Sequence, residues 1–220
     1  MAEFQLYSYY RSSCSYRVRI ALHLKRLPFV YQAVHLVREG GEQRRPDYLK
    51  LNPMGQVPCL IHDGKALAQS MAIIEYLDRV APTPRLFPED PWQAAQVREL
   101  CEHVNTGIQP IQNLKVLQRI ERDYGASGAN KVAWAKAWIE MGFEALEHAL
   151  TTTAGLCSFG DEVTAADLFL VPQVYNADRF KVDMTAFPTI ARINEHCLAL
   201  EAFQKAEPAN QPDTPADYGA

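Results

Sequence analysis

The 220-residue sequence contains no apolar run that approaches the roughly 20 residues needed to cross a bilayer. Its first residues also lack the basic and then apolar order of an export signal. Hydrophobic residues make up 48% of the chain and charged residues 22%, which argues against a disordered or collagen-like protein. We therefore expect a soluble, cytoplasmic protein with no membrane partner.

Cysteine is scarce and scattered. The five cysteines are odd in number and no two are three residues apart, which excludes a C-x-x-C redox pair and a regular disulfide framework. No two of the six histidines lie four residues apart, and they form no tight cluster with cysteine or carboxylate. We expect no metal site.

Basic tracts are also missing, although charge is divided unevenly. Residues 1–82 carry 11 basic and 7 acidic side chains, a net of +4, whereas residues 83–220 carry 11 and 19, a net of −8. The net positive charge of residues 1–82 favours a small anion as the ligand. Nucleic acid is the competing ligand, but the basic residues are interleaved with apolar ones, so we expect no nucleic-acid partner.

The first part of the chain predicts a strand, a helix and a second strand. The strands are expected at residues 4–9 and 29–34 and the helix at 14–25, an order that forms a right-handed parallel unit. The spacing i, i+3, i+4 and i+7 is occupied by Val18, Ala21, Leu22 and Lys25, which predicts one buried side. Arg17 and Arg19 are expected to point away from that side.

Turn signals divide the following stretch. A turn at residues 52–55 precedes a strand at 57–61, and Asp63-Gly64 predicts a hairpin to a short strand at 65–67. A helix is expected at residues 70–80. The sheet elements and helices of this part together predict an α/β unit.

Three prolines within seven residues, from Pro82 to Pro88, indicate a linker. We expect one domain at residues 1–82, a linker at 83–91, and an all-helical bundle at 92–220. Apolar residues after the linker step by three and four in two runs: Val97, Cys101, Val104, Ile108 and Ile111, and then Ile139, Phe143, Leu146 and Leu150. Within the bundle, Thr164 and Asp167 have the spacing of a capping box before a fully apolar helix. The tail from Pro208 is rich in Pro, Ala and Asp, and we expect it to be loosely ordered.

Ser12, Ser13 and Cys14 lie where the first strand gives way to the first helix. Hydroxyl groups and unpaired backbone N–H groups meet there at the positive end of the helix dipole, which favours an anion. The plain alternative is that one serine caps the helix and the cysteine is a small packed residue.

The run from Ser12 to Leu22 resembles the signature of zeta-class glutathione transferases, the family that contains maleylacetoacetate and maleylpyruvate isomerases. Tyr16 stands where the family often has tryptophan, which leaves the anion site intact. The resemblance continues in order through Asn52–Pro58, Gln69–Leu77, Gly107–Leu114, Asn176–Asp183 and Gln211–Pro215.

The resemblance implies an α/β thioredoxin-like N-terminal domain that binds glutathione, followed by an all-α helical-bundle C-terminal domain that shapes the pocket for a second substrate. It further implies a homodimer. The implied activity is glutathione-dependent cis–trans isomerisation of maleylacetoacetate, a dicarboxylate, in aromatic amino-acid breakdown.

Glutathione contacts are also implied residue by residue. Val57 and Pro58 resemble a cis-proline turn whose backbone pairs with the cysteinyl part, and Gln69 and Ser70 begin a helix that receives the γ-glutamyl carboxylate. The alternatives are a plain turn and a plain helix cap. Further contacts with glutathione or substrate are Gln43, Gln109, Asn113 and Lys115. Gln109 and Asn113 are expected on one face of one helix.

Arg179 is implied as the ligand of a substrate carboxylate, because its guanidinium can bind a carboxylate through two hydrogen bonds. Arg11 is the second choice. For both, the alternative is a solvated surface arginine.

The catalytic task is to keep the glutathione sulfur ionised, and we expect Ser13 to lead with Ser12 and Cys14 assisting. In the alternative, Cys14 itself attacks the substrate.

Three competing functions stay open. Maleylpyruvate isomerisation differs only in a shorter substrate, and a conjugating transferase for small electrophiles such as α-halo acids would release the addition product. A non-catalytic module that kept the fold is disfavoured by the intact Ser-Ser-Cys, Val-Pro and Gln-Ser sites.

Overall fold

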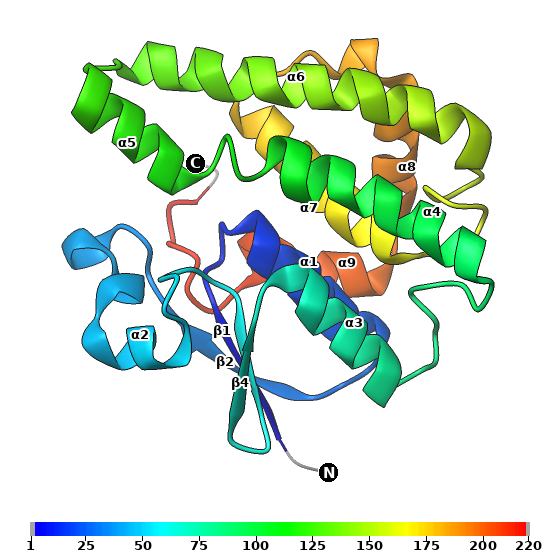
Figure 1. Cartoon of the computed structure of the whole chain (residues 1–220), viewed down its shortest axis with the longest axis horizontal. Coiled ribbons are helices and arrows are strands. Elements are labelled where there is room, and N and C mark those ends of the chain that lie inside the picture. Colours follow the sequence, from blue (N-terminus) through cyan, green and yellow to red (C-terminus); the bar gives the residue numbers. More distant parts are fainter. Residues whose placement is uncertain (1–2, 219–220) are drawn as a thin grey trace. The chain divides into compact units, whose positions relative to one another are not determined.

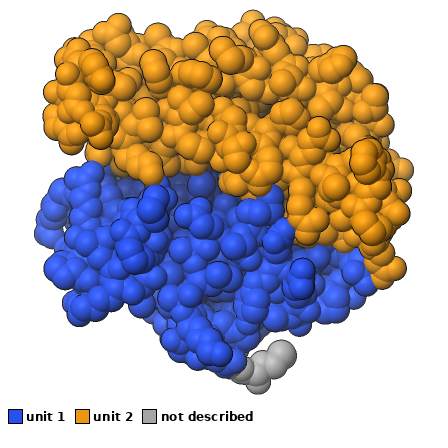
Figure 2. Space-filling view, viewed as in Figure 1, with its two compact units in different colours: residues 1–86, 199–220 blue, residues 87–198 orange. Residues whose placement is uncertain are grey.

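The computed structural model describes residues 3–218, which divide into two compact units (Figure 2). The first unit combines the chain up to Leu86 with the segment from Ala199 onward, and the second is Phe87–Leu198. Among the described residues, no helix is both long enough and apolar enough to cross a membrane.

The first unit is built on a four-stranded mixed sheet in the order β2-β1-β3-β4 (Figure 1). Strands β1 and β2 are parallel, with Phe4 opposite Phe29, which confirms the predicted parallel unit. Strand β3 runs antiparallel to β1, with Leu6 opposite Leu60, and pairs with β4 through the predicted hairpin. The strands are β1 Phe4–Ser8, β2 Phe29–Ala33, β3 Cys59–His62 and β4 Lys65–Ala68.

Helix α1 lies at the centre of this unit and packs against α3 and α9 (Figure 1). Its apolar residues, with those of β1 and α3, form a core that excludes water; Leu6, Ile20 and Ile73 are fully buried. The polar stretch after β2 forms two short 3₁₀ turns before α2. The helices are α1 Ser13–Leu24, α2 Pro46–Leu51, α3 Ser70–Val80 and α9 Glu201–Ala206, and the 3₁₀ turns are Arg38–Gly40 and Glu42–Arg44.

The prediction that Arg17 and Arg19 point away from the buried side of α1 is wrong. Both side chains have an exposed fraction of 0%. The helix is enclosed because α3 and α9 pack against it, and the two guanidinium groups bind oxygen atoms inside the unit instead of water. A buried charge requires such partners.

The C-terminal segment also differs from its prediction. We expected residues 199–220 to belong with the helical bundle and the tail to be loosely ordered, but α9 packs against α1 of the first unit. Gln211 is buried, and its amide nitrogen donates to the carbonyls of Lys205 and Glu207 at 2.9 and 2.7 Å. These bonds give the described part of the tail a defined path, because a buried amide must find partners. Residues 219 and 220, which the prediction included, lie outside the described residues.

The second unit is all-helical, as predicted. Its central element is α7, which is buried over most of its length and packs against α4 and α8 (Figure 1). The predicted apolar stripe of α6 is buried, Ile139 and Phe143 fully so. The helices are α4 Pro91–Glu102, α5 Leu114–Tyr124, α6 Gly128–Thr153, α7 Ala165–Arg179 and α8 Pro188–Leu198, and a π-helical turn, His103–Ile108, follows α4 directly.

The predicted capping box begins α7. One oxygen of the Asp167 carboxylate accepts from the Thr164 backbone N–H at 2.8 Å and from its hydroxyl at 3.3 Å. The other oxygen accepts from the Ser158 N–H at 2.7 Å. Burial raises the pKa of Asp167, and these donors act in the opposite direction. The box therefore satisfies polar groups that α7 buries at its start.

Replacing Thr164 with alanine should lower the free energy of unfolding by about 1–2 kcal/mol, because the helix loses its capping residue and Asp167 loses a donor. Urea unfolding of the whole chain measures the change. Thr152→Ala is the matched control, because that threonine is exposed at the end of α6 and donates only to the carbonyl of Ala149. Equal losses in the two variants would contradict the role of the box.

Candidate functional site

The start of α1 separates the roles of the two serines. Ser12 is the N-cap, and its hydroxyl oxygen accepts from the Ser15 backbone N–H at 3.2 Å. Its own N–H donates to the carbonyl of Tyr9 at 3.0 Å, which closes the turn between β1 and α1. Ser13 is the first helical residue and takes no part in the cap. Thus the capping alternative holds for Ser12, and Ser13 keeps its hydroxyl for another partner.

The helix end beside these serines carries the partial positive charge of the α1 dipole. The first turn of α1 carries no acidic side chain, so the partial positive charge of the helix end is not neutralised there. Cys14, a free thiol, is half-buried in the same turn, and Arg11 is partly exposed just before it. Such an end binds an anion through backbone N–H groups and hydroxyls.

The Val57-Pro58 peptide bond is cis, as the resemblance implied. Val57 is buried immediately before β3. The preceding carbonyl, that of Gln56, accepts from the Tyr48 hydroxyl at 2.6 Å and the Asn52 amide at 2.7 Å. Two side chains from α2 and the residue that follows it therefore hold this turn in one orientation.

The start of α3 shows a strained backbone and a polarised hydroxyl. Gln69 has φ of 74°, a region that residues other than glycine seldom occupy, and such strain is often found at functional sites. Ser70, nearly buried, accepts from Nη1 of Arg17 at 3.1 Å. Because its oxygen already accepts from a cation, the hydroxyl is left to donate its proton, which suits an anionic ligand.

Gln43 lies in the second 3₁₀ turn and is buried. Its amide nitrogen donates to the carbonyl of Leu36 at 3.2 Å, whereas its buried Oε1 has no hydrogen-bond partner among the described residues. The Gln43 amide lies close to the backbone of Gly41, and only glycine leaves room for it. The φ of Gly41 is 102°, and a Cβ there would lie 2.6 Å from the amide nitrogen and oxygen of Gln43.

In the second unit, the prediction that Gln109 and Asn113 share one helix is wrong. The π-helical turn ends at Ile108, and Asn113 is the N-cap of the next helix, α5, where its side chain accepts from the Lys115 N–H at 3.2 Å. Pro110 explains the break, because proline lacks an N–H and clashes with the preceding helical turn. Lys115 is exposed, and Gln109 is partly exposed.

Arg179 is the last residue of α7 and is exposed. Its Nη1 donates to the side chain of Asn176 at 3.2 Å, and its guanidinium carbon lies 5.8 and 5.5 Å from the ring centres of Tyr175 and Phe180. The aromatic rings and the amide restrict the arginine while its charge remains accessible. Arg179 is thus a constrained arginine at the surface, in contrast to the fully solvated one of the alternative.

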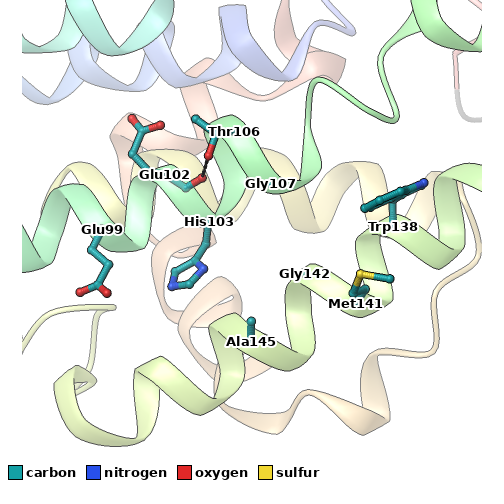
Figure 3. Close-up of a pocket in the computed structure, with 9 residues that line it drawn as sticks. All are labelled: Glu99, Glu102, His103, Thr106, Gly107, Trp138, Met141, Gly142 and Ala145. Atoms are coloured by element: carbon teal, nitrogen blue, oxygen red, sulfur yellow. Dashed lines mark hydrogen bonds between the residues drawn. The ribbon is translucent and has the colours of Figure 1, made fainter.

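A hollow of about 480 Å³ in the second unit is lined by none of the predicted site residues (Figure 3). The α6 side contributes Trp138 and Met141, and His103 comes from the π-helical turn. Gly142 lets α6 approach that turn, because a Cβ there would lie 2.2 Å from Ile108 Cγ1. In the sequence, the hollow is indicated only by the three-residue spacing of Trp138 and Met141 on α6. The same spacing is equally typical of a helix face that packs against the core.

Cys157, Asp167 and Cys197 form a group whose potential ligand atoms lie within 4.8 Å of one another. Both oxygens of Asp167 already accept hydrogen bonds from the capping box and from Ser158. A hydrogen bond with Cys157 and burial raise the pKa of Cys197, which keeps the thiol protonated. We assign this group to the core of the second unit.

Comparisons with known proteins agree on one family. Residues 11–80 match the family model of the glutathione S-transferase N-terminal domain. The chain is 50% identical to maleylacetoacetate isomerase of Rattus norvegicus over 212 residues, 96% of this chain and 95% of that protein.

Two solved structures are similar over almost the whole chain. The holo structure of a maleylpyruvate isomerase, described as a bacterial zeta-class glutathione S-transferase, has a TM-score of 0.93 and 43% identity and covers 96% of this chain and 100% of that one. Maleylacetoacetate isomerase of Anaeromyxobacter dehalogenans, with dicarboxyethyl glutathione and citrate in its active site, has a TM-score of 0.85 and 43% identity and covers 97% and 98%.

The division of roles at the start of α1 gives a stability test. Ser12→Ala should lower the free energy of unfolding by about 1 kcal/mol, because the cap of α1 is lost. Ser13→Ala should lower it by less than Ser12→Ala does, because Ser13 is not the cap. Urea unfolding compares the two single variants with the unaltered protein. A larger loss in Ser13→Ala than in Ser12→Ala would reverse the assignment.

Proposed function

This chain belongs to the zeta class of glutathione transferases, and we propose that it is a glutathione-dependent cis–trans isomerase that converts maleylacetoacetate to fumarylacetoacetate. The observation that carries the proposal is the start of α1, where Ser12 forms the cap and leaves Ser13 available beside Cys14 at an unneutralised helix end. Identity of 50% to the rat isomerase over nearly the whole chain supports the choice of reaction.

The residues of the first unit fit glutathione. The cis turn at Val57-Pro58 offers a fixed backbone to the cysteinyl part, and Ser70, whose oxygen already accepts from Arg17, can donate to the γ-glutamyl carboxylate beside Gln69. Gln43 adds an amide oxygen with no partner among the described residues. Gln109, Asn113 and Lys115 belong to the proposal as further contacts and rest on the family resemblance alone.

Bound glutathione supplies a thiolate that adds reversibly to the conjugated cis double bond, so that the bond becomes single, rotates, and is restored in the trans form when the thiolate leaves. The protein must keep that sulfur ionised near neutral pH, against a free thiol pKa of roughly 8.5. Ser13, with Ser12 and Cys14 assisting, donates hydrogen bonds that favour the anion, and the end of α1 adds its positive potential. The same hydroxyls or Arg11 stabilise the enolate that forms on addition.

Arg179 binds a substrate carboxylate in this proposal, with Arg11 as the second candidate. Its hydrogen bond to Asn176 and its two aromatic neighbours restrict its rotamers, so less conformational entropy is lost when it binds a carboxylate.

Maleylpyruvate isomerisation is the second candidate function. The specific observation in its favour is the TM-score of 0.93 with a zeta-class maleylpyruvate isomerase. A conjugating transferase for small electrophiles would share the thiolate site but would consume glutathione. A homodimer, which the family resemblance implies, and a cytoplasmic location, which is expected from the sequence, complete the proposal.

Ultraviolet monitoring of both maleyl substrates, with and without glutathione, tests the function. We expect turnover of maleylacetoacetate that depends on glutathione and leaves its concentration unchanged, because the thiol is regenerated. Faster turnover of maleylpyruvate would select the second candidate, and stoichiometric loss of glutathione would identify a conjugating enzyme.

In the same assay, the Ser13→Ala variant should lose more than about tenfold in kcat, and the Cys14→Ala variant should lose less. The reverse ranking would favour direct attack by Cys14.

Arg179→Ala should raise KM about tenfold or more for a dianionic substrate and much less for a neutral one, because one charge-assisted contact is lost only with the former. Steady-state kinetics with a maleyl diacid and a neutral electrophile measure the difference. Arg192→Ala serves as control, because Arg192 is another arginine of the second unit and donates to the carbonyl of Gly155. Equal increases for both substrates would exclude the carboxylate contact.

A further inference from the structure

Two charged side chains hold the turn that precedes Ser12. Arg19 donates from Nη1 to the carbonyl of Tyr9 at 3.3 Å and from Nη2 to that of Tyr10 at 3.0 Å. Asp213 accepts the Tyr10 backbone N–H at 3.0 Å. Both backbone polar groups of Tyr10 therefore have ionic partners, one on α1 and one 203 residues further along the chain.

Asp213 is itself fixed in place. Its second oxygen accepts from the Tyr31 hydroxyl of β2 at 2.7 Å, and burial raises the pKa of Tyr31, so this hydroxyl remains a donor. Arg19 also donates from Nε to the carbonyl of Ala206 at 3.0 Å, which ties the end of α9 to α1. The buried amide of Gln211 holds the chain between α9 and Asp213. Hydrogen bonds therefore hold the chain from α9 to Asp213 and keep the Asp213 carboxylate beside the turn.

We propose that Asp213 is a positioning residue for the glutathione thiolate: it orients the Tyr9–Ser12 turn, and through it the hydroxyl and N–H groups at the start of α1. This inference rests on the proposed function. Its physical basis is the short chain between Tyr10 and Ser12, because a rotation of the Tyr10 peptide is transmitted directly to the cap of α1. Hydrogen bonds to a developing or bound anion depend steeply on such orientation.

A purely structural role for Asp213 would stabilise the fold without affecting the bound sulfur. The discriminating quantity is therefore the pKa of the glutathione thiol in the complex, which reports the donors that face it. Other contacts of the tripeptide, at Ser70 and Val57, lie on α3 and before β3 and do not depend on the turn. A variant that disturbs only the turn should therefore change the pKa of the bound thiol and leave the affinity for glutathione nearly unchanged.

The variant is Asp213→Asn in the full chain, with Asp217→Asn as matched control because Asp217 is exposed in the same segment. Asparagine keeps the size but is neutral and has one carbonyl oxygen, so the Tyr10 N–H loses its charge-assisted hydrogen bond and only one of the two present donors can still find an acceptor oxygen there. Ultraviolet difference absorbance against pH measures ionisation of the bound thiol, and calorimetry measures glutathione affinity.

Removing the negative charge of Asp213 by itself favours a nearby thiolate and lowers its pKa, so an increase in that pKa reports donors that have lost their orientation. We expect the loss of orientation to dominate in Asp213→Asn and to raise the pKa of the bound thiol by about one unit, a roughly tenfold change in its ionisation constant. The Kd for glutathione should change by less than about threefold, and kcat at neutral pH should fall with the thiolate fraction. Asp217→Asn should match the unaltered protein in all three quantities.

Tyr31→Phe is a second, milder variant that removes one donor to Asp213 and leaves the carboxylate. It should shift the thiol pKa in the same direction by a smaller amount, and it decides the question if Asp213→Asn does not fold. An unchanged thiol pKa in the folded variants, even with a lower melting temperature, would overturn the positioning role. Failure of the unaltered protein to bind glutathione would instead overturn the proposed function, and the positioning role with it.

Discussion

The burial of two guanidinium groups in α1 is the constraint on which the first unit depends. Arg17 and Arg19 have an exposed fraction of 0%, and a buried cation is tolerated only where oxygen atoms replace water. Arg19 takes those oxygens from the turn after β1 and from the end of α9, and Arg17 takes one from Ser70. The hydrogen bonds of Arg19 thus connect the turn after β1, near the start of the chain, with the end of α9, near its C-terminus.

The same contacts prepare the chemistry. Arg17 links the starts of α1 and α3, so the two helix ends proposed to hold the thiolate and the γ-glutamyl carboxylate are fixed to one another inside one unit. Ser12 uses its oxygen for the cap and Ser70 uses its own for Arg17, which leaves hydroxyl protons for anionic ligands. The hydrogen bonds that stabilise the fold thereby determine which hydroxyl groups can donate to a ligand.

Local patterns predicted much of the fold because their causes are local. The α3 helix was predicted at its observed bounds, 70–80, and the hairpin at Asp63-Gly64 and the capping box at Thr164 follow from turn and cap chemistry within four residues. The cis bond at Val57-Pro58 came from family resemblance. The joint placement of Gln109 and Asn113 failed because the helical turn ends at Ile108, just before Pro110, and proline is a local signal that the i, i+4 spacing did not include.

The sequence by itself determined the elements, the two-part organisation with its helical second unit, the family, and the serines at the start of α1, because periodicity, caps and ordered motifs can be read within short windows. Only the tertiary structure decided that Arg17 and Arg19 are buried, that Ser12 caps while Ser13 does not, and that the tail joins the first unit through Asp213. Those outcomes depend on partners up to 203 residues apart, whose pairing is fixed by packing and by the cost of leaving buried polar groups unbonded.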